Sequence, residues 1–146
     1  MEKEQMGKDH KGKDHKGKDW IVKLEDAVTG ELHGGAGTFR VLIDEPRSGA
    51  RHFSLLVNTS RAGAKGSAHT HEVEHCWYIL SGTGTMYMDG KAARIGPKTA
   101  IYTPPGVLHK IDVDEGEDLT YVVIYAPPGP EQQLKAKGVH AFDPKK

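Results

Sequence analysis

The stretch His69-Thr70-His71-Glu72-Val73-Glu74-His75 places three imidazoles within seven residues. Histidines two residues apart on an extended strand share a face, so His69 and His71 can converge on one point. His75 has the same parity, but an unbroken strand would hold it about 13 Å beyond His71. We therefore expect a turn or bulge at Glu72 and Val73 that brings His75 back. Because neutral imidazole is a common metal ligand, this spacing predicts a metal site.

A fourth histidine follows a strong turn signal later in the chain. Pro104-Pro105-Gly106 forces a bend in which Gly106 is free to take a positive φ, and His109 comes three residues after it. His109 therefore belongs to a separate strand and reaches the same metal only if that strand lies beside the others. A closed barrel supplies such an arrangement.

The sequence between Trp20 and Tyr125 is typical of short strands bounded by Gly, Pro, Asn or Asp, and it shows no helical periodicity over about 10 residues or more. This pattern predicts an all-β sandwich or barrel. Asp89-Gly90 predicts a tight hairpin, and Glu131 to Lys137 could form one or two helical turns. The expected strands are 39–43, 51–57, 75–80, 85–88, 99–102, 107–113 and 119–125.

These motifs resemble those of the cupin superfamily, over residues 39–125. The family's first motif is Gly, five residues, His-x-His, three or four residues, Glu, six residues and Gly, and its second is Pro-x-Gly-x-x-His. The positions that match are Gly63, His69, His71, His75 and Gly82, then Pro104, Gly106 and His109. His75 replaces the carboxylate, which is similar to a four-histidine subgroup. Lys98 and Val113 replace a usual Gly and Asn, at positions of turn and rim rather than of ligation.

The resemblance implies a cupin double-stranded β-helix, or jelly-roll, barrel around one divalent metal. It implies His69, His71, His75 and His109 as ligands, and Mn or Fe as the favoured ion, with Zn, Ni and Cu also suited to imidazole. Trp77 and Tyr102 are candidate pocket residues, whereas no catalytic acid or base is identified. Two open metal positions favour a dioxygenase-like, O₂-dependent oxidation. A non-redox isomerase or lyase reaction, or sugar or metabolite binding without turnover, stays open.

The first histidine motif also contains a competing motif. His71-Glu72-Val73-Glu74-His75 also spells His-Glu-x-x-His, the signature of zinc proteases, with Glu72 as general base. That interpretation needs a helix, whereas the Cys76-Trp77-Tyr78-Ile79 that follows favours a strand. It would also leave His69 and His109 without a role.

Composition limits the remaining possibilities. The 146 residues predict one barrel domain at 20–126, a flexible low-complexity tail of Gly-Lys-Asp-His-Lys repeats at 1–19, and a Pro-rich extension at 127–146. Lys plus Arg balance Asp plus Glu at 20 each, which recommends no nucleic-acid or membrane partner. A single cysteine and no apolar leader indicate a cytoplasmic protein. The resemblance implies a small-molecule substrate. We expect a homodimer by analogy with similar sandwich sheets.

Overall fold

A computed structural model describes residues 18–32 and 35–137 of the chain. Almost all of the repeat tail expected at 1–19, and the end of the extension expected at 127–146, lie outside the described residues. The described strands are β1 (Val28–Leu32), β2 (Gly37–Ile43), β3 (Ser54–Ser60), β4 (Glu74–Ser81), β5 (Gly84–Met88), β6 (Lys91–Ile95), β7 (Ala100–Thr103), β8 (His109–Val113) and β9 (Leu119–Ala126). The helices are η2 (Leu24–Asp26), α2 (Glu45–Ser48) and α3 (Pro130–Lys137).

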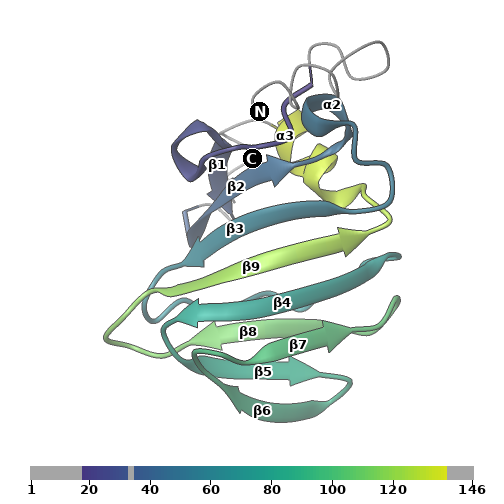
Figure 1. The fold of residues 1–146 in the computed structure, drawn as a ribbon. Helices are drawn as coiled ribbons and strands as arrows, with labels where there is room; N and C mark the ends of the chain where they lie inside the picture. The colour runs from purple at the N-terminus through teal and green to yellow at the C-terminus, as the bar shows by residue number, and fades with distance from the viewer. Residues whose placement is uncertain (1–17, 33–34, 138–146) are drawn as a thin grey trace.

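The strands form two antiparallel sheets (Figure 1). One has the order β1-β2-β3-β9-β4-β7 and the other the order β6-β5-β8. After β4 the chain passes to the smaller sheet for β5 and β6, returns to the larger sheet for β7, and then forms β8 in the smaller sheet and β9 in the larger one. This path places β9 between β3 and β4, which are distant from it in sequence. The all-β barrel architecture expected from the sequence is therefore confirmed.

The core lies between the two sheets and follows from strand alternation. In β9, Leu119, Tyr121, Val123 and Tyr125 point inward and are buried, while the residues between them are partly exposed. Inward residues of β3 and β4 meet them, among them fully buried Leu56 and Ile79. Burying each such side chain contributes about 1.5 to 3 kcal/mol, which makes this interior the main source of stability.

All seven expected strands are present, with β3 displaced by three residues toward its C-terminal end. The expected hairpin joins β5 and β6, where Asp89 and Gly90 both have positive φ. The expected helical turns at residues 131–137 are α3. Two strands, β1 and β6, were missed. No helix in the described part of the chain is long and apolar enough to cross a membrane.

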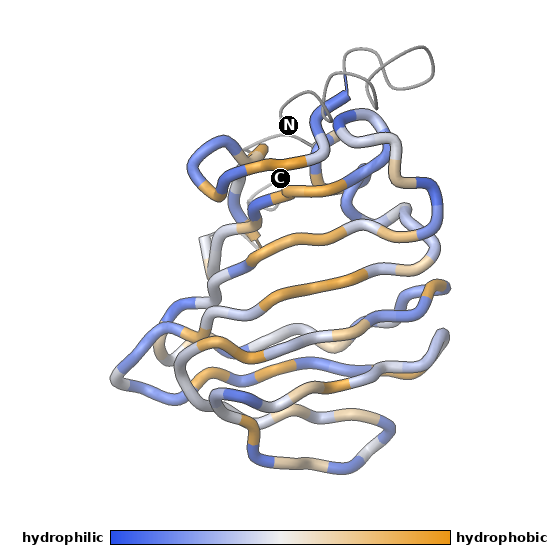
Figure 2. Tube along the Cα trace, viewed as in Figure 1, coloured by the Kyte–Doolittle hydropathy of each residue, from blue (hydrophilic) through white to orange (hydrophobic). Residues whose placement is uncertain are grey.

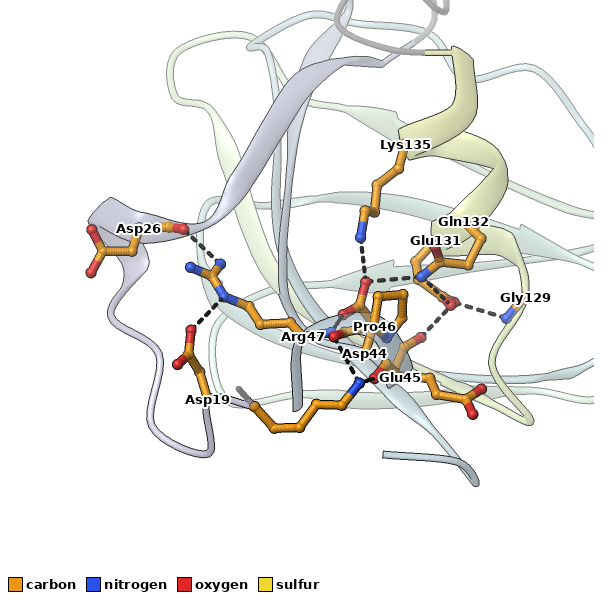
Figure 3. A network of polar contacts seen from close by, with 12 residues as sticks. Asp19, Asp26, Asp44, Glu45, Pro46, Arg47, Gly129, Glu131, Gln132 and Lys135 are labelled. Carbon is orange, nitrogen blue, oxygen red and sulfur yellow. Dashed lines mark hydrogen bonds and ion pairs between the residues drawn. The ribbon is translucent and has the colours of Figure 1, made fainter. Parts of the chain in front are cut away.

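Helix α3 is fastened to the barrel by a buried polar network (Figure 3). Asp44, which is 1% exposed, accepts hydrogen bonds from Lys135 Nζ at 2.7 Å and from Gln132 Nε2 at 2.8 Å. Fully buried Glu131 accepts a hydrogen bond from Ser54 Oγ at 2.8 Å. Since buried charges require such partners, this network fixes the position of α3 against β2 and β3.

Candidate metal centre

Three of the four predicted ligands are positioned by backbone pairing at the edge of the smaller sheet. His109 is the first residue of β8, and its backbone exchanges two hydrogen bonds with His69, at 3.0 and 3.1 Å. The backbone carbonyl of His71 accepts a hydrogen bond from Gly106 N at 2.8 Å, within the Pro-Pro-Gly bend. The Pro-Pro-Gly bend at 104–106 therefore fixes the position of His71 relative to His109.

The imidazoles of these three residues face one another. Ring centroids lie 4.4 Å apart for His69 and His109, 4.9 Å for His69 and His71, and 5.4 Å for His71 and His109. One ligand nitrogen from each lies within 4.8 Å of the other two. With bonds of about 2 Å from a metal to each nitrogen, this spacing suits a single ion.

Two backbone carbonyls orient the rings. His69 Nδ1 lies 2.8 Å from the carbonyl oxygen of Ser67, and His109 Nδ1 lies 2.9 Å from that of Val107. A carbonyl oxygen only accepts, so Nδ1 of each ring carries the proton and Nε2 carries the lone pair. Histidine ligands of metals are usually held in this way.

His75 lies beside this group rather than within it. A bend at Glu72 and Val73 precedes β4, as expected, and brings the His75 ring centroid to 5.2 Å from that of His71. The ring is stacked on Trp77, with centroids 4.0 Å apart. The structure thus gathers three histidines and not the four expected, because His75 belongs to β4 of the larger sheet, between β9 and β7, and stacks on Trp77 there.

Several ring nitrogens at this site are buried without a hydrogen-bond partner. They are Nε2 of His109 and both Nδ1 and Nε2 of His75. A buried polar atom left unpaired costs about 1 to 3 kcal/mol, so folded proteins rarely keep one. A metal ion is the partner that fits Nε2 of His109 and one of the two His75 nitrogens, because it accepts the lone pair of a neutral imidazole.

The electrostatics agree with neutral imidazole. Burial, and then repulsion by His69 and His109, lowers the pKa of His71 to about 4. Burial, and then the neighbouring histidines, lowers the pKa of His75 to about 2. The pKa of His109 is also lowered, chiefly by burial. At neutral pH these three rings are therefore unprotonated and competent to bind a metal.

Two small cavities of about 60 Å³ each adjoin the histidines. Both are lined by His69, Trp77 and Tyr121. Tyr125 and Asn58 line only the second, where the ring centroid of Tyr125 is 4.6 Å from that of His75. Each cavity has room for roughly four water molecules, so only a few atoms of a substrate would enter it.

The two predicted pocket residues have different surroundings. Trp77 is buried, lines both cavities and donates a hydrogen bond from Nε1 to Thr103 Oγ1 at 3.2 Å. Tyr102 is 50% exposed, and its hydroxyl donates to Glu74 at 3.0 Å. It lines a separate apolar cavity of about 370 Å³ between β7 and the β5–β6 hairpin. Tyr102 has the parity of Cys76, opposite to that of the buried residues.

Sequence reasoning missed Tyr121, Tyr125 and Asn58. The two tyrosines have the alternating parity of β9 and share a face with Leu119 and Val123. That alternation is a signal from which both could have been found. The zinc-protease interpretation of residues 71–75 is wrong, because these residues form a bend and the start of β4 instead of a helix.

Comparison with known proteins agrees with this architecture. Residues 57–125 match the family model described as a cupin domain. An RmlC-like cupin from Shewanella frigidimarina NCIMB 400 is 15% identical, with a TM-score of 0.67 over 78% of this chain and 96% of that chain. The structure of KdgF from Halomonas sp. is 15% identical, with a TM-score of 0.66 over 78% and 98%. The chain therefore has the cupin fold.

One similar structure has a higher sequence identity. The polyketide cyclase RemF from Streptomyces resistomycificus is 27% identical, with a TM-score of 0.67 over 77% of this chain and 82% of that chain. No curated protein matches the sequence.

Proposed function

We propose that this chain is a mononuclear metalloenzyme that uses a divalent metal as a Lewis acid on a small oxygen-bearing substrate, in a cyclase- or isomerase-type reaction. His69, His71 and His109 would hold the ion, with His75 as a fourth ligand. The observation that carries the proposal is the set of buried ring nitrogens without partners, on His75 and His109, beside a group of three histidines.

The metal would polarise a carbonyl or hydroxyl oxygen of the substrate and so acidify a neighbouring C–H bond, whose proton would pass to a water molecule in the adjoining cavity. Imidazole ligands suit Mn, Fe, Zn, Ni and Cu alike. Our preference for Mn or Fe rests on the resemblance to four-histidine cupins.

The lining of the two cavities indicates which groups would surround the substrate. No Asp or Glu lines either cavity among the residues that the structure describes, so the chain offers no carboxylate base there. The walls are instead aromatic, from Trp77, Tyr121 and Tyr125. Similarity to a polyketide cyclase at 27% identity favours a substrate that bears carbonyl groups, of which only the reacting end would enter these cavities.

The tyrosines would bind and orient such a substrate. Burial raises the pKa of Tyr121 and of Tyr125, so both hydroxyls stay protonated at neutral pH. The Tyr121 hydroxyl is 3.0 Å from Ser60 Oγ, which holds it in place. Each phenol can donate a hydrogen bond to a substrate oxygen on which negative charge develops.

The test begins with metal analysis of untagged protein, followed by reloading with Mn²⁺, Fe²⁺ or Zn²⁺. Each form is then incubated without oxygen with a panel of β-diketones, hydroxynaphthoquinones and hydroxy acids, and products are followed by mass spectrometry. We expect turnover that needs metal but not O₂ and that is lost in His109→Ala. His52→Leu, which changes an exposed histidine elsewhere, serves as the matched control.

The same experiment distinguishes the alternatives. Turnover that consumes O₂ would replace the proposal with the dioxygenase-like oxidation expected from the sequence. Tight metal and ligand binding without turnover would indicate a binding module. Full metal content in His109→Ala would refute the metal centre itself.

A further inference from the structure

Asn58 places a buried amide on the inner face of β3. The side chain is 4% exposed, and Leu56, two residues before it on the same face, is fully buried. Figure 2 shows long hydrophobic stretches along β3 and β9, so the amide lies on a largely apolar wall. Buried polar atoms normally have hydrogen-bond partners, because leaving them unpaired is costly. The surroundings of the two ends of this amide therefore indicate its role.

The oxygen of the amide has a partner within the protein. Oδ1 of Asn58 accepts a hydrogen bond at 3.3 Å from the backbone N–H of Arg40, on β2. Because a backbone N–H only donates, it selects the oxygen of the amide and excludes the nitrogen from this position. The NH₂ group therefore lies on the other side of the amide, away from this bond.

The nitrogen of the same amide has no hydrogen-bond partner among residues 18–32 and 35–137. Asn58 lines the second cavity beside the histidines, of about 60 Å³, together with His69, His75 and Tyr121. Both ring nitrogens of His75 are enclosed, whereas Nδ2 of Asn58 is not among such enclosed atoms. The NH₂ group is therefore a donor available to a molecule in this cavity.

A free NH₂ group recognises an oxygen that accepts hydrogen bonds. Carbonyl oxygens accept and have no proton to give, whereas an ammonium group offers only donors. The one acceptor atom of Asn58 is already bonded to Arg40, so the amide has none for the donor of a ligand. Asn58 therefore favours a ligand with a carbonyl oxygen at this position.

The size of the cavity sets the spacing between this oxygen and the proposed metal site. His69 and His75 line the same space, and its room for roughly four water molecules leaves about three carbon atoms between an oxygen that faces the histidines and one at Asn58. The two oxygens of a β-dicarbonyl compound have this spacing. When negative charge develops on such a compound it is shared by both oxygens, and a fixed N–H donor stabilises the share on the second oxygen.

We propose that Asn58 binds the substrate, and that its NH₂ group donates a hydrogen bond to one oxygen of a β-dicarbonyl compound whose other oxygen faces the three histidines. This inference rests on the proposed function, because it needs the metal at His69, His71 and His109. It narrows the substrate class to β-dicarbonyl compounds. It also makes Asn58 the residue that distinguishes them from compounds with one carbonyl group.

Asn58 is the single asparagine of the chain, so its amide can be observed alone. Protein labelled with asparagine that carries nitrogen-15 in the side-chain amide gives one pair of NH₂ signals by NMR. The protein is loaded with Zn²⁺, which has no unpaired electrons, and titrated with acetylacetone or with methyl propyl ketone, which lacks the second oxygen. We expect acetylacetone to shift the NH₂ signals and to bind at least about tenfold more tightly than the monoketone.

Two amide-to-carboxylate substitutions provide a matched comparison by calorimetry. Asn58→Asp keeps an oxygen for the Arg40 N–H and replaces the NH₂ group with a second oxygen, so the dissociation constant of acetylacetone should rise at least about tenfold. Gln133→Glu makes the same change at an exposed position of α3 and should leave this constant unchanged. Circular dichroism checks folding, and the NMR titration of the unsubstituted protein tests the proposal even if Asn58→Asp does not fold.

Several results would overturn the proposal. Acetylacetone that binds the zinc-loaded protein without moving the NH₂ signals would show that the amide contacts only water. Equal binding of the two ketones, unchanged affinity in Asn58→Asp, or no binding of acetylacetone at millimolar concentration would also reject it.

Failure of the proposed function gives different results. Metal content is measured after each titration, and a protein that retains no zinc would reject the metal centre and this inference together. Retained zinc with unmoved NH₂ signals would reject the role of Asn58 alone. Shifted NH₂ signals without turnover of any β-diketone would support the role of Asn58 in binding and reject the enzymatic reaction.

Discussion

Replacing His75 with leucine should make the metal-free protein more stable. The imidazole is 2% exposed and neither of its nitrogens has a hydrogen-bond partner. Taken as one donor and one acceptor at about 1 to 2 kcal/mol each, the lower half of the usual range, leaving both unpaired costs about 2 to 4 kcal/mol. Leucine has a similar volume but loses the stacking on Trp77, which is worth about 0.5 to 1.5 kcal/mol. We expect a net gain of about 2 kcal/mol in the free energy of unfolding, the difference between the midpoints of these two ranges.

The order should reverse when metal is present. Metal at about 1,000 times its dissociation constant stabilises the wild-type protein by about 4 kcal/mol. If the loss of the fourth ligand weakens binding about 100-fold, the His75→Leu variant gains only about 1.4 kcal/mol from the same metal. With metal, the free energy of unfolding of the wild-type protein is then about 1 kcal/mol higher than that of His75→Leu, although it is lower without metal.

Urea unfolding with and without chelator measures both differences, and His52→Leu controls for the removal of a histidine as such. A His75→Leu variant that is less stable than wild type in chelator would show that the buried ring has partners in solution. An equal metal-induced gain in both proteins would show that His75 is not a ligand.

Three further perturbations follow from the fold. Lys135→Met leaves the carboxylate of Asp44 buried with only uncharged donors and should lower the free energy of unfolding in urea by about 2 to 3 kcal/mol. Adding Asp44→Asn should restore part of this stability, and a double variant no more stable than Lys135→Met would contradict the pairing. In Gly66→Ala the new Cβ would lie 2.5 Å from the Ile111 carbonyl oxygen and would displace the segment that carries His69 from β8. Metal titration should therefore show weaker binding, and an unchanged affinity would contradict this reasoning. Metal-free protein should lose stability as pH falls from about 6.5 to about 4, because the unfolded chain protonates His71 first; thermal unfolding should show a shallower slope in His71→Gln.

The local features of the site could be predicted from the sequence because they depend on short-range chemistry. The bend at Glu72 and Val73 follows from the distance that an unbroken strand would put between His71 and His75. The hairpin at Asp89 follows from the φ values that Asp-Gly tolerates. The sequence also limits the fold class, because alternation in β3, β4 and β9 marks an inner face.

The features that were missed depend on pairing between distant residues or on weak local patterns. Strand β6 presents four exposed residues in a row, so it has no alternation to detect. The bond between Asp44 and Lys135 joins residues 91 positions apart. Tyr102 was predicted as a pocket residue, and its register opposite Cys76 places it at the separate cavity between β7 and the β5–β6 hairpin, away from the histidines. Register is set by the pairing of strands and becomes known only with the sheet.

The position of His75 gives the proposed metal centre a role in stabilising the fold in addition to its chemical role. His69 and His109 belong to the edge of the smaller sheet, where two backbone hydrogen bonds join them. His75 belongs to β4 of the larger sheet, between β9 and β7. An ion bound by all of them would therefore link the two sheets across the core. On the proposed function, metal binding and closure of the barrel are coupled, because the metal would satisfy Nε2 of His109 and one His75 nitrogen, which are unpaired in the metal-free fold.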